Sequence, residues 1–189
     1  MTYWQQLTAK EWEEIRLQVM AEEEALMQLN NRTVDYVATG EQQSDAGHVL
    51  QGAFGKGTYD GEFYVDAHSG QWFSYQLATR GVKEGVSLMC RFHSADAGRV
   101  VTIFVNGEEL TTMTLERKPF VGHYNWECPI EPEMLMQGGE LRDSITVRFV
   151  ASGNTPAPGL YYLRLLKASS NGKMPRKIYV ADGKKKVRR

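Results

Sequence analysis

The chain has 189 residues, of which 42% are hydrophobic and 11% aromatic, a composition typical of a globular protein with one sizeable core and appendages. It contains no apolar run approaching the roughly 18 residues that cross a membrane, and its first residues, MTYWQQLTAKEWEE, lack the basic start and apolar segment of a signal peptide. The formal net charge is −1, and no basic patch interleaved with aromatic residues indicates nucleic-acid binding.

Residues 8–29 are predicted to form an amphipathic helix. Thr8 and Glu11 have the T-x-x-E spacing of a capping box, which satisfies backbone amides at a helix start. Asn30 or Asn31 is the expected C-cap. Apolar side chains recur at spacings of three and four, the period of one helix face, and this stripe must be buried against another surface. The stripe residues are Trp12, Ile15, Val19, Leu26 and Leu29.

From residue 33 onward the apolar pattern has a period of two, which is typical of half-buried strands. The predicted strands are 33–38, 48–54, 61–66, 71–78, 86–93, 99–106, 109–116, 122–130, 143–151 and 159–167. Asn106-Gly107, between two of these strands, favours a type I′ hairpin turn. Many short strands, with no helix long enough to join parallel strands, predict an all-β fold. We expect a jelly-roll-like antiparallel β-sandwich preceded by one amphipathic helix.

The sequence therefore divides into three segments: a helical lead-in segment at residues 1–32, a β-sandwich domain at 33–168 and a basic linker or tail at 169–189. The last six residues, KKKVRR, carry five positive charges, so the rest of the chain is acidic. A nucleic-acid-binding arm and an import signal are alternatives for this tail, but the acidic body favours a solvated terminus.

The in-register apolar residues of six strands should form the core, because two stacked sheets bury their facing sides against each other. Cys90 and Cys128 belong to this inward set, and we expect two buried free thiols; a disulfide would need their Cα atoms within about 7 Å. The predicted core residues are Phe73, Tyr75, Leu77, Val86, Leu88, Cys90, Phe92, Val101, Ile103, Val105, Tyr124, Trp126, Cys128, Ile145, Val147 and Phe149.

No catalytic or metal-binding spacing is present. The four histidines lie in separate segments, and H-E-x-x-H, C-x-x-C and G-x-S-x-G motifs are absent, so we expect no catalytic residue, no cofactor and no zinc site. The stretch GAFGKGTYDG precedes a strand rather than a helix, which indicates a loop and bend between sheets rather than a phosphate cradle. Structural calcium is a less favoured alternative, with oxygen ligands from Glu41, Asp45, Asp60 or Asp66.

Trp72, in the stretch GQWFSYQL, is the leading candidate for a ligand contact. Because Phe73 points to the core, Trp72 points to the opposite face of the strand. An open indole face with polar neighbours is a platform for a sugar ring, and Tyr59, Asp60 and Gln76 are candidates for those polar groups. The alternative, which the sequence favours, is that Trp72 is buried under a loop, the helix or a neighbouring domain.

Several outward strand positions carry aromatic, methionine and arginine side chains, which are typical of interfaces rather than of solvated strands. We predict that part of this surface is covered by a neighbouring domain or by the 8–29 helix. The predicted interface residues are Trp12, Ile15, Val19, Met89, Arg91, Phe104, Arg148, Tyr162 and Arg164.

Four phrases of the sequence together resemble a known domain: RTVDYVATGEQQSDAGHVLQG, GTYDGEFYVDAHSGQWFSYQL, SLMCRFHSADAGRVVTIFVNGEEL and SITVRFVASGNTPAPGLYYLRLL. Over about residues 32–167 the chain is similar to the C-terminal β-sandwich domain of bacterial proteins related to the β-L-arabinofuranosidase family of glycoside hydrolases, formerly a domain of unknown function. The resemblance implies a sandwich of the carbohydrate-binding-module kind. In that family a separate (α/α) barrel does the chemistry, with a nucleophilic cysteine among zinc ligands, and nothing in this sequence matches that set.

The resemblance therefore implies a non-catalytic accessory domain of a glycoside hydrolase. It would pack on the catalytic domain of the same parent protein and assist the binding of a plant glycan, with no nucleic acid or membrane as partner. It also implies a periplasmic or secreted parent protein. A purely structural sandwich without a ligand and, less favoured, a stand-alone glycoside hydrolase with an unrecognised site are the alternatives.

Overall fold

The computed structural model of the protein describes residues 7–168. The chain divides into two compact units, residues 1–33 and residues 34–189. Among the described residues, none of the helices combines the length and the apolar character needed to cross a bilayer. The predicted basic tail at 169–189 lies outside the described residues.

The first unit contains helix α1, Ala9–Arg32. The predicted capping box is confirmed: the Thr8 hydroxyl accepts a hydrogen bond from the Glu11 amide at 3.3 Å, and the Glu11 carboxylate accepts one from the Thr8 amide at 2.7 Å. None of the helix residues is buried, and Trp12 is 60% exposed. Four residues of the predicted apolar stripe, Trp12, Ile15, Val19 and Leu26, are therefore exposed, and Leu29 is half-buried.

The predicted end of this helix is wrong. Asn30 and Asn31 both lie inside α1, and Thr33 caps it in an extended conformation. The Thr33 hydroxyl donates to the Leu29 carbonyl at 2.8 Å, so a side chain one turn later satisfies a carbonyl at the helix end. A left-handed asparagine cap is not needed there.

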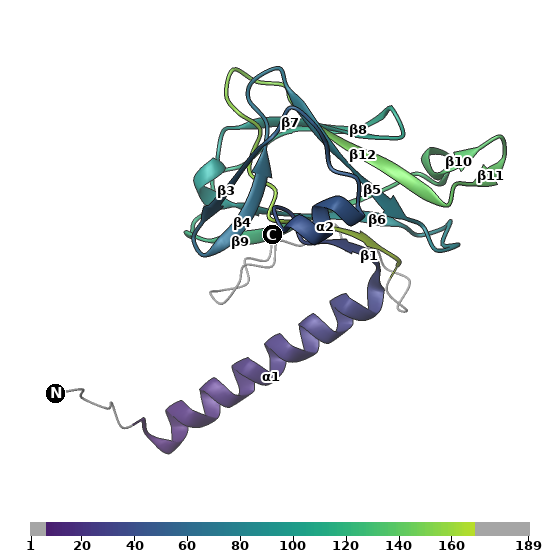
Figure 1. The fold of residues 1–189 in the computed structure, drawn as a ribbon. Coiled ribbons are helices and arrows are strands. Elements are labelled where there is room, and N and C mark those ends of the chain that lie inside the picture. Colours follow the sequence, from purple (N-terminus) through teal and green to yellow (C-terminus); the bar gives the residue numbers. More distant parts are fainter. Residues whose placement is uncertain (1–6, 169–189) are drawn as a thin grey trace. The chain divides into compact units, whose positions relative to one another are not determined.

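The second unit is an antiparallel β-sandwich, which confirms the predicted fold class. Figure 1 shows two layers, with β7, β8 and β12 in one layer and β1, β6 and β9 in the other. The four-stranded sheet has the order β1 (Thr33–Val37), β13 (Tyr162–Leu166), β6 (Ser87–His93) and β9 (His123–Pro129). The five-stranded sheet has the order β2 (Gln51–Gly52), β5 (Trp72–Ala78), β12 (Ser144–Ala151), β7 (Val100–Val105) and β8 (Glu108–Thr114).

Smaller elements connect these sheets. Two hairpins stand outside them, β3 (Gly55–Tyr59) with β4 (Glu62–Asp66) and β10 (Met136–Gln137) with β11 (Glu140–Leu141). The short helices are α2 (Gln42–Gly47), η1 (Ser94–Asp96) and η2 (Pro132–Leu135). Asn106 and Gly107 have φ values of 51° and 86°, as the predicted type I′ turn between β7 and β8 requires.

The core lies between the two sheets, and the predicted set of core residues is confirmed with one exception. Phe73 of β5 stacks on Phe149 of β12 with ring centres 5.0 Å apart, and both are 1% exposed. The exception is Cys128, which is half-buried near the end of β9. Cys90 and Cys128 are free thiols, and burial raises the pKa of the Cys90 thiol well above its usual range.

The glycine-rich stretch is not the predicted loop. Residues 55–59 form strand β3, which pairs with β4 through a tight turn at Asp60-Gly61, where φ is 49° and 79°. Gly57 faces the Tyr64 ring so closely that a Cβ there would lie 2.5 Å from the Tyr64 Oη. The glycines that hide the strand pattern are thus required by packing across the hairpin.

The segment 38–54 also differs from its prediction. The predicted strand 48–54 is reduced to the two residues of β2, and α2 precedes it. The carboxylate of Asp45, on α2, is 5% exposed and accepts hydrogen bonds from the Tyr75 hydroxyl at 2.7 Å and the Lys56 Nζ at 2.5 Å. This tertiary contact favours the helical turn, and it cannot be seen in the local sequence.

Trp126→Ala should destabilise the sandwich by about 3–5 kcal/mol, because Trp126 is 7% exposed within the core and its removal leaves a cavity. Urea unfolding followed by circular dichroism measures the change. Trp12→Ala, at a position 60% exposed in the other unit, is the matched control and should leave the unfolding of the sandwich unchanged. Equal effects of the two substitutions would contradict the assignment.

Candidate functional site

Trp72 lies on the outer side of the five-stranded sheet. Its neighbour Phe73 points into the core, and successive side chains of a strand point to opposite faces. The Trp72 side chain is 36% exposed, so the sandwich itself does not bury it as the sequence favoured. Gln76, four residues along the same strand, is also exposed on this face, and it lies opposite Thr146 of β12.

Arg148 of β12 extends between aromatic side chains from both neighbouring strands. Its guanidinium carbon lies 5.5 Å from the centre of the Trp72 ring and 5.1 Å from the centre of the Phe104 ring. The register explains this contact: Arg148 pairs with Phe104 of β7 on one side, and Trp72 is two residues from its partner on β5. We call Trp72, Gln76, Phe104, Thr146 and Arg148 the Trp72 face.

Arg148 has no ion-pair or hydrogen-bond partner for its side chain among the described residues. The nearest carboxylate by register is that of Glu109 on β8, which lies opposite Phe104 and accepts a hydrogen bond from the Thr112 hydroxyl at 2.7 Å. Thr112 in turn contacts Thr102 at 2.8 Å. The hydroxyls and the carboxylate at this end of the sheet therefore satisfy one another.

Tyr59 and Asp60 do not join Trp72, so that part of the predicted ligand site is wrong. They lie at the end of the β3–β4 hairpin and contact the four-stranded sheet. The Tyr59 ring meets the His93 ring edge-on at 4.9 Å, and the Asp60 carboxylate lies 3.1 Å from the His93 Nε2. The hairpin was interpreted as a loop, and a loop would have allowed these side chains to reach the other sheet.

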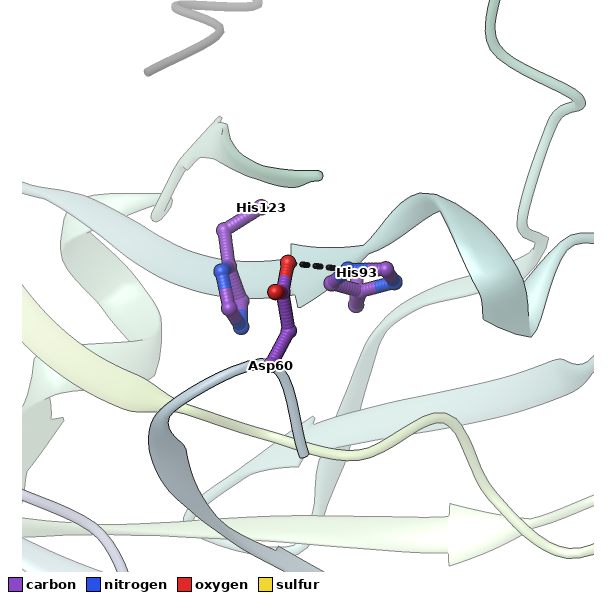
Figure 2. A group of neighbouring side chains, drawn as sticks. All are labelled: Asp60, His93 and His123. Carbon is purple, nitrogen blue, oxygen red and sulfur yellow. Dashed lines mark hydrogen bonds and ion pairs between the residues drawn. The ribbon is translucent and has the colours of Figure 1, made fainter. Parts of the chain in front are cut away.

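Asp60, His93 and His123 form a cluster that the sequence did not predict (Figure 2). His93 and His123 are paired residues on β6 and β9, and Figure 2 shows the Asp60 carboxylate between the two rings. Possible ligand atoms of the three side chains lie within 4.8 Å of one another. Only the pairing of strands 30 residues apart could have revealed this group, because no motif spacing relates its members.

The hydrogen bonds of His93 disfavour a metal ion in this cluster. The His93 Nδ1 accepts from the Ala95 amide at 3.0 Å, which places the ring proton on Nε2, where it is donated to Asp60. A metal would need a lone pair on Nε2, and the neutral ring has no second one to offer. The cluster is best explained as a hydrogen-bonded contact that holds the hairpin on the sheet.

The predicted calcium ligands do not gather either. Within residues 7–168 the group of three His, Cys, Asp or Glu ligands is the histidine cluster, which includes Asp60 alone of the four candidates. Asp45 is neutralised by Lys56, and burial raises the pKa of the Asp66 carboxyl. Glu41 is exposed just before α2.

The predicted interface residues fall into three groups. Ile15 and Val19 of α1 are exposed, as Trp12 is. Phe104, Arg148 and Tyr162 are half-buried. The buried ones are Met89, Arg91 and Arg164.

The contacts of Arg91 show how the four-stranded sheet differs from the five-stranded sheet. Its guanidinium donates two hydrogen bonds to the Glu62 carboxylate, at 2.9 Å and 2.8 Å, and Glu62 belongs to the β3–β4 hairpin. A bidentate pair of this kind is strong and specific in geometry. On the four-stranded sheet the chain therefore supplies the carboxylate for Arg91 itself, whereas Arg148 on the five-stranded sheet has none.

Residues 28–166 match a family that is described as a family of unknown function, DUF6805. The chain belongs to this family. The match begins in the last turns of α1 and ends with β13, so it spans the whole described sandwich. The description of DUF6805 names no activity. No curated protein matches the sequence.

The chain is similar to several solved structures, and one of them, with a TM-score of 0.50, shows the same kind of sandwich. A family 35 carbohydrate binding module from an environmental isolate matches with a TM-score of 0.50 and 12% identity, over 71% of this chain and 93% of the module. The family 35 module from Clostridium thermocellum gives a TM-score of 0.40 and 16% identity, over 63% and 88%. An exo-β-1,3-galactanase from Phanerochaete chrysosporium gives 0.46 and 12%, over 71% of this chain and 29% of the enzyme. At these identities the likeness shows the fold alone.

His123 should make the sandwich sensitive to acid. Burial lowers the pKa of its imidazole below the ordinary value of 6.5, although the Glu62 carboxylate, 3.5 Å from Nδ1, opposes the shift. The unfolded chain then binds more protons than the folded one between the two pKa values, so the free energy of unfolding falls as the pH falls through that window.

His123→Gln should therefore flatten the acid side of the stability profile. Urea unfolding midpoints measured at about pH 7.5 and pH 5 test this prediction. Between these two pH values the unsubstituted protein should lose more stability than the variant. The same loss in both proteins would show that the titration of His123 does not contribute.

Proposed function

We propose that this chain is a non-catalytic accessory domain that binds carbohydrate through the Trp72 face. The observation that carries the proposal is the exposure of Trp72 on a strand whose other aromatic residues are buried. An indole that is 36% exposed offers an apolar surface on which a sugar ring can stack. Gln76 and Thr146 are exposed on the same face roughly 13 Å along the strands from Trp72, where they can reach the hydroxyls of a neighbouring sugar residue in a chain.

The fold supports this proposal without deciding it. The sandwich resembles that of a family 35 carbohydrate binding module, but one fold carries many functions. The Trp72 face is an open sheet surface, which suits a segment of an extended polysaccharide better than a small, enclosed substrate. The Asp60, His93 and His123 side chains hold one another in a structural contact.

The parent protein that we propose is a bacterial glycoside hydrolase related to the β-L-arabinofuranosidase family. The four phrases that resemble that group lie within the DUF6805 match, at residues 28–166. In this proposal the accessory domain packs on the catalytic domain, and the exposed apolar residues of α1, including Ile15 and Val19, contribute to that contact. The ligand is then a plant glycan, and the parent acts outside the cytoplasm.

Trp72→Ala tests the proposed surface. Affinity electrophoresis in gels containing arabinan, arabinogalactan, xylan or polygalacturonate should show that at least one of them retards the protein. The variant should bind about 30-fold more weakly, as expected when an aromatic anchor worth roughly 2 kcal/mol is removed. Its melting temperature should stay close to that of the original protein, because Trp72 lies outside the core.

Trp12→Ala is the control for the loss of a tryptophan, and it should bind as the original protein does. Retardation by none of the four polysaccharides would overturn the proposed function and favour a purely structural sandwich. Unchanged binding by Trp72→Ala would show that carbohydrate is held elsewhere. Hydrolysis of a polysaccharide by the pure domain would contradict its assignment as non-catalytic.

A further inference from the structure

We propose that the carbohydrate bound at the Trp72 face is acidic and that Arg148 recognises its carboxylate. This inference rests on the proposed function and adds the chemical class of the ligand. Its starting point is the environment of Arg148, a cation in the middle strand of five, half-buried between two aromatic rings and without a carboxylate partner among the described residues.

The position of Arg148 explains why its lack of a carboxylate partner among the described residues bears on ligand binding. Arginines on an exposed loop are commonly solvated, but Arg148 lies on β12, between β5 and β7. The Trp72 and Phe104 rings, 5.5 Å and 5.1 Å from its guanidinium carbon, take the place of water around part of the cation. A partly desolvated guanidinium with free N–H groups gains more from an anion than a solvated one does.

Competing carboxylates of the same face are already engaged or distant. Glu109 lies on the far side of Phe104 and accepts from Thr112. In the four-stranded sheet the guanidinium of Arg91 is neutralised by Glu62, whose carboxylate accepts two hydrogen bonds from it. Arg148 lacks such a residue, so its five donors remain available to a ligand.

The arrangement suits a uronic acid residue in particular. The Arg148 guanidinium lies over the Trp72 ring, so a sugar ring packed against the exposed part of the indole lies beside Arg148. A carboxylate on the ring can then accept two parallel hydrogen bonds from the planar guanidinium, a geometry that lysine cannot reproduce. A neutral sugar would keep the stacking and lose the charge-assisted bonds.

The test compares polygalacturonate with its fully methyl-esterified form, in which the same backbone has no charge. Isothermal titration calorimetry with oligomers of both should show binding of the acid at least 10-fold tighter than that of the ester. Arg148→Gln should weaken binding of the acid roughly 10- to 100-fold and leave the weak binding of the ester unchanged, since a hydrogen bond to a charged group is lost. Arg148→Lys should restore only part of the difference.

Arg117→Gln is the matched control, because it removes one positive charge from an exposed position outside the Trp72 face and should leave both affinities unchanged. Equal affinity for acid and ester, or binding of the acid that Arg148→Gln does not weaken, would overturn the inference while leaving the proposed function intact. If the original protein binds neither oligomer and neither of the neutral polysaccharides arabinan and xylan, the proposed function itself is refuted. Melting temperatures of the variants establish that each is folded.

Discussion

The stacked pair of Phe73 and Phe149 is the contact on which the Trp72 face depends. The two rings lie nearly parallel, 13° apart, on neighbouring strands of the five-stranded sheet, and Ile103 of β7 lies opposite Phe149 on the other side. All three side chains must enter the core, because the two sheets are stable only when their facing sides are buried. Alternation along each strand then turns the neighbouring residues outward.

This one constraint explains why Trp72, Arg148 and Phe104 meet. Each is adjacent in sequence to one of the three core residues, and the antiparallel register brings the outward neighbours together just as it does the inward ones. A shift of one residue in β12 would bury Arg148 and expose Phe149, at a large cost in free energy, and the same shift in β5 or β7 would expose Phe73 or Ile103. The packing of the core therefore fixes Trp72, Arg148 and Phe104 close to one another on the outer face.

The sequence predicts the parts of this account that depend on local pattern. The period of two predicts the sandwich and nearly all of its core, and it predicts that Trp72 and Phe73 point to opposite faces of their strand. The pairing of β5 with β12, which lie far apart in the sequence, has no local signal, so the sequence cannot predict the contact of Trp72 with Arg148 and instead assigns Arg148 to an interface. The sequence misplaces Tyr59 and Asp60, because Gly57, which packs against the Tyr64 ring, and Gly55, which packs against Asp66, conceal the strand pattern of the hairpin.

The two outer faces of the sandwich therefore differ in a way that bears on function. On the four-stranded sheet the β3–β4 hairpin supplies Glu62 to Arg91 and Asp60 to His93, so these two side chains have carboxylate partners within the chain. On the five-stranded sheet Trp72 is exposed, and Arg148 contacts two aromatic rings without a carboxylate partner in the part of the chain that the structure describes. A surface with an exposed indole and an unneutralised guanidinium side by side is suited to a ligand that is both ring-shaped and anionic.

The indole N–H signals of the four tryptophans provide the most direct measurement of this claim. In a two-dimensional NMR titration with oligogalacturonate, we expect a saturable shift of the Trp72 indole signal together with the side-chain signal of Arg148. The signal of Trp126, which is 7% exposed in the core, should not move. A titration in which polysaccharide binding is evident but the Trp72 indole signal stays fixed would contradict the account, because carbohydrate would then be held at another surface.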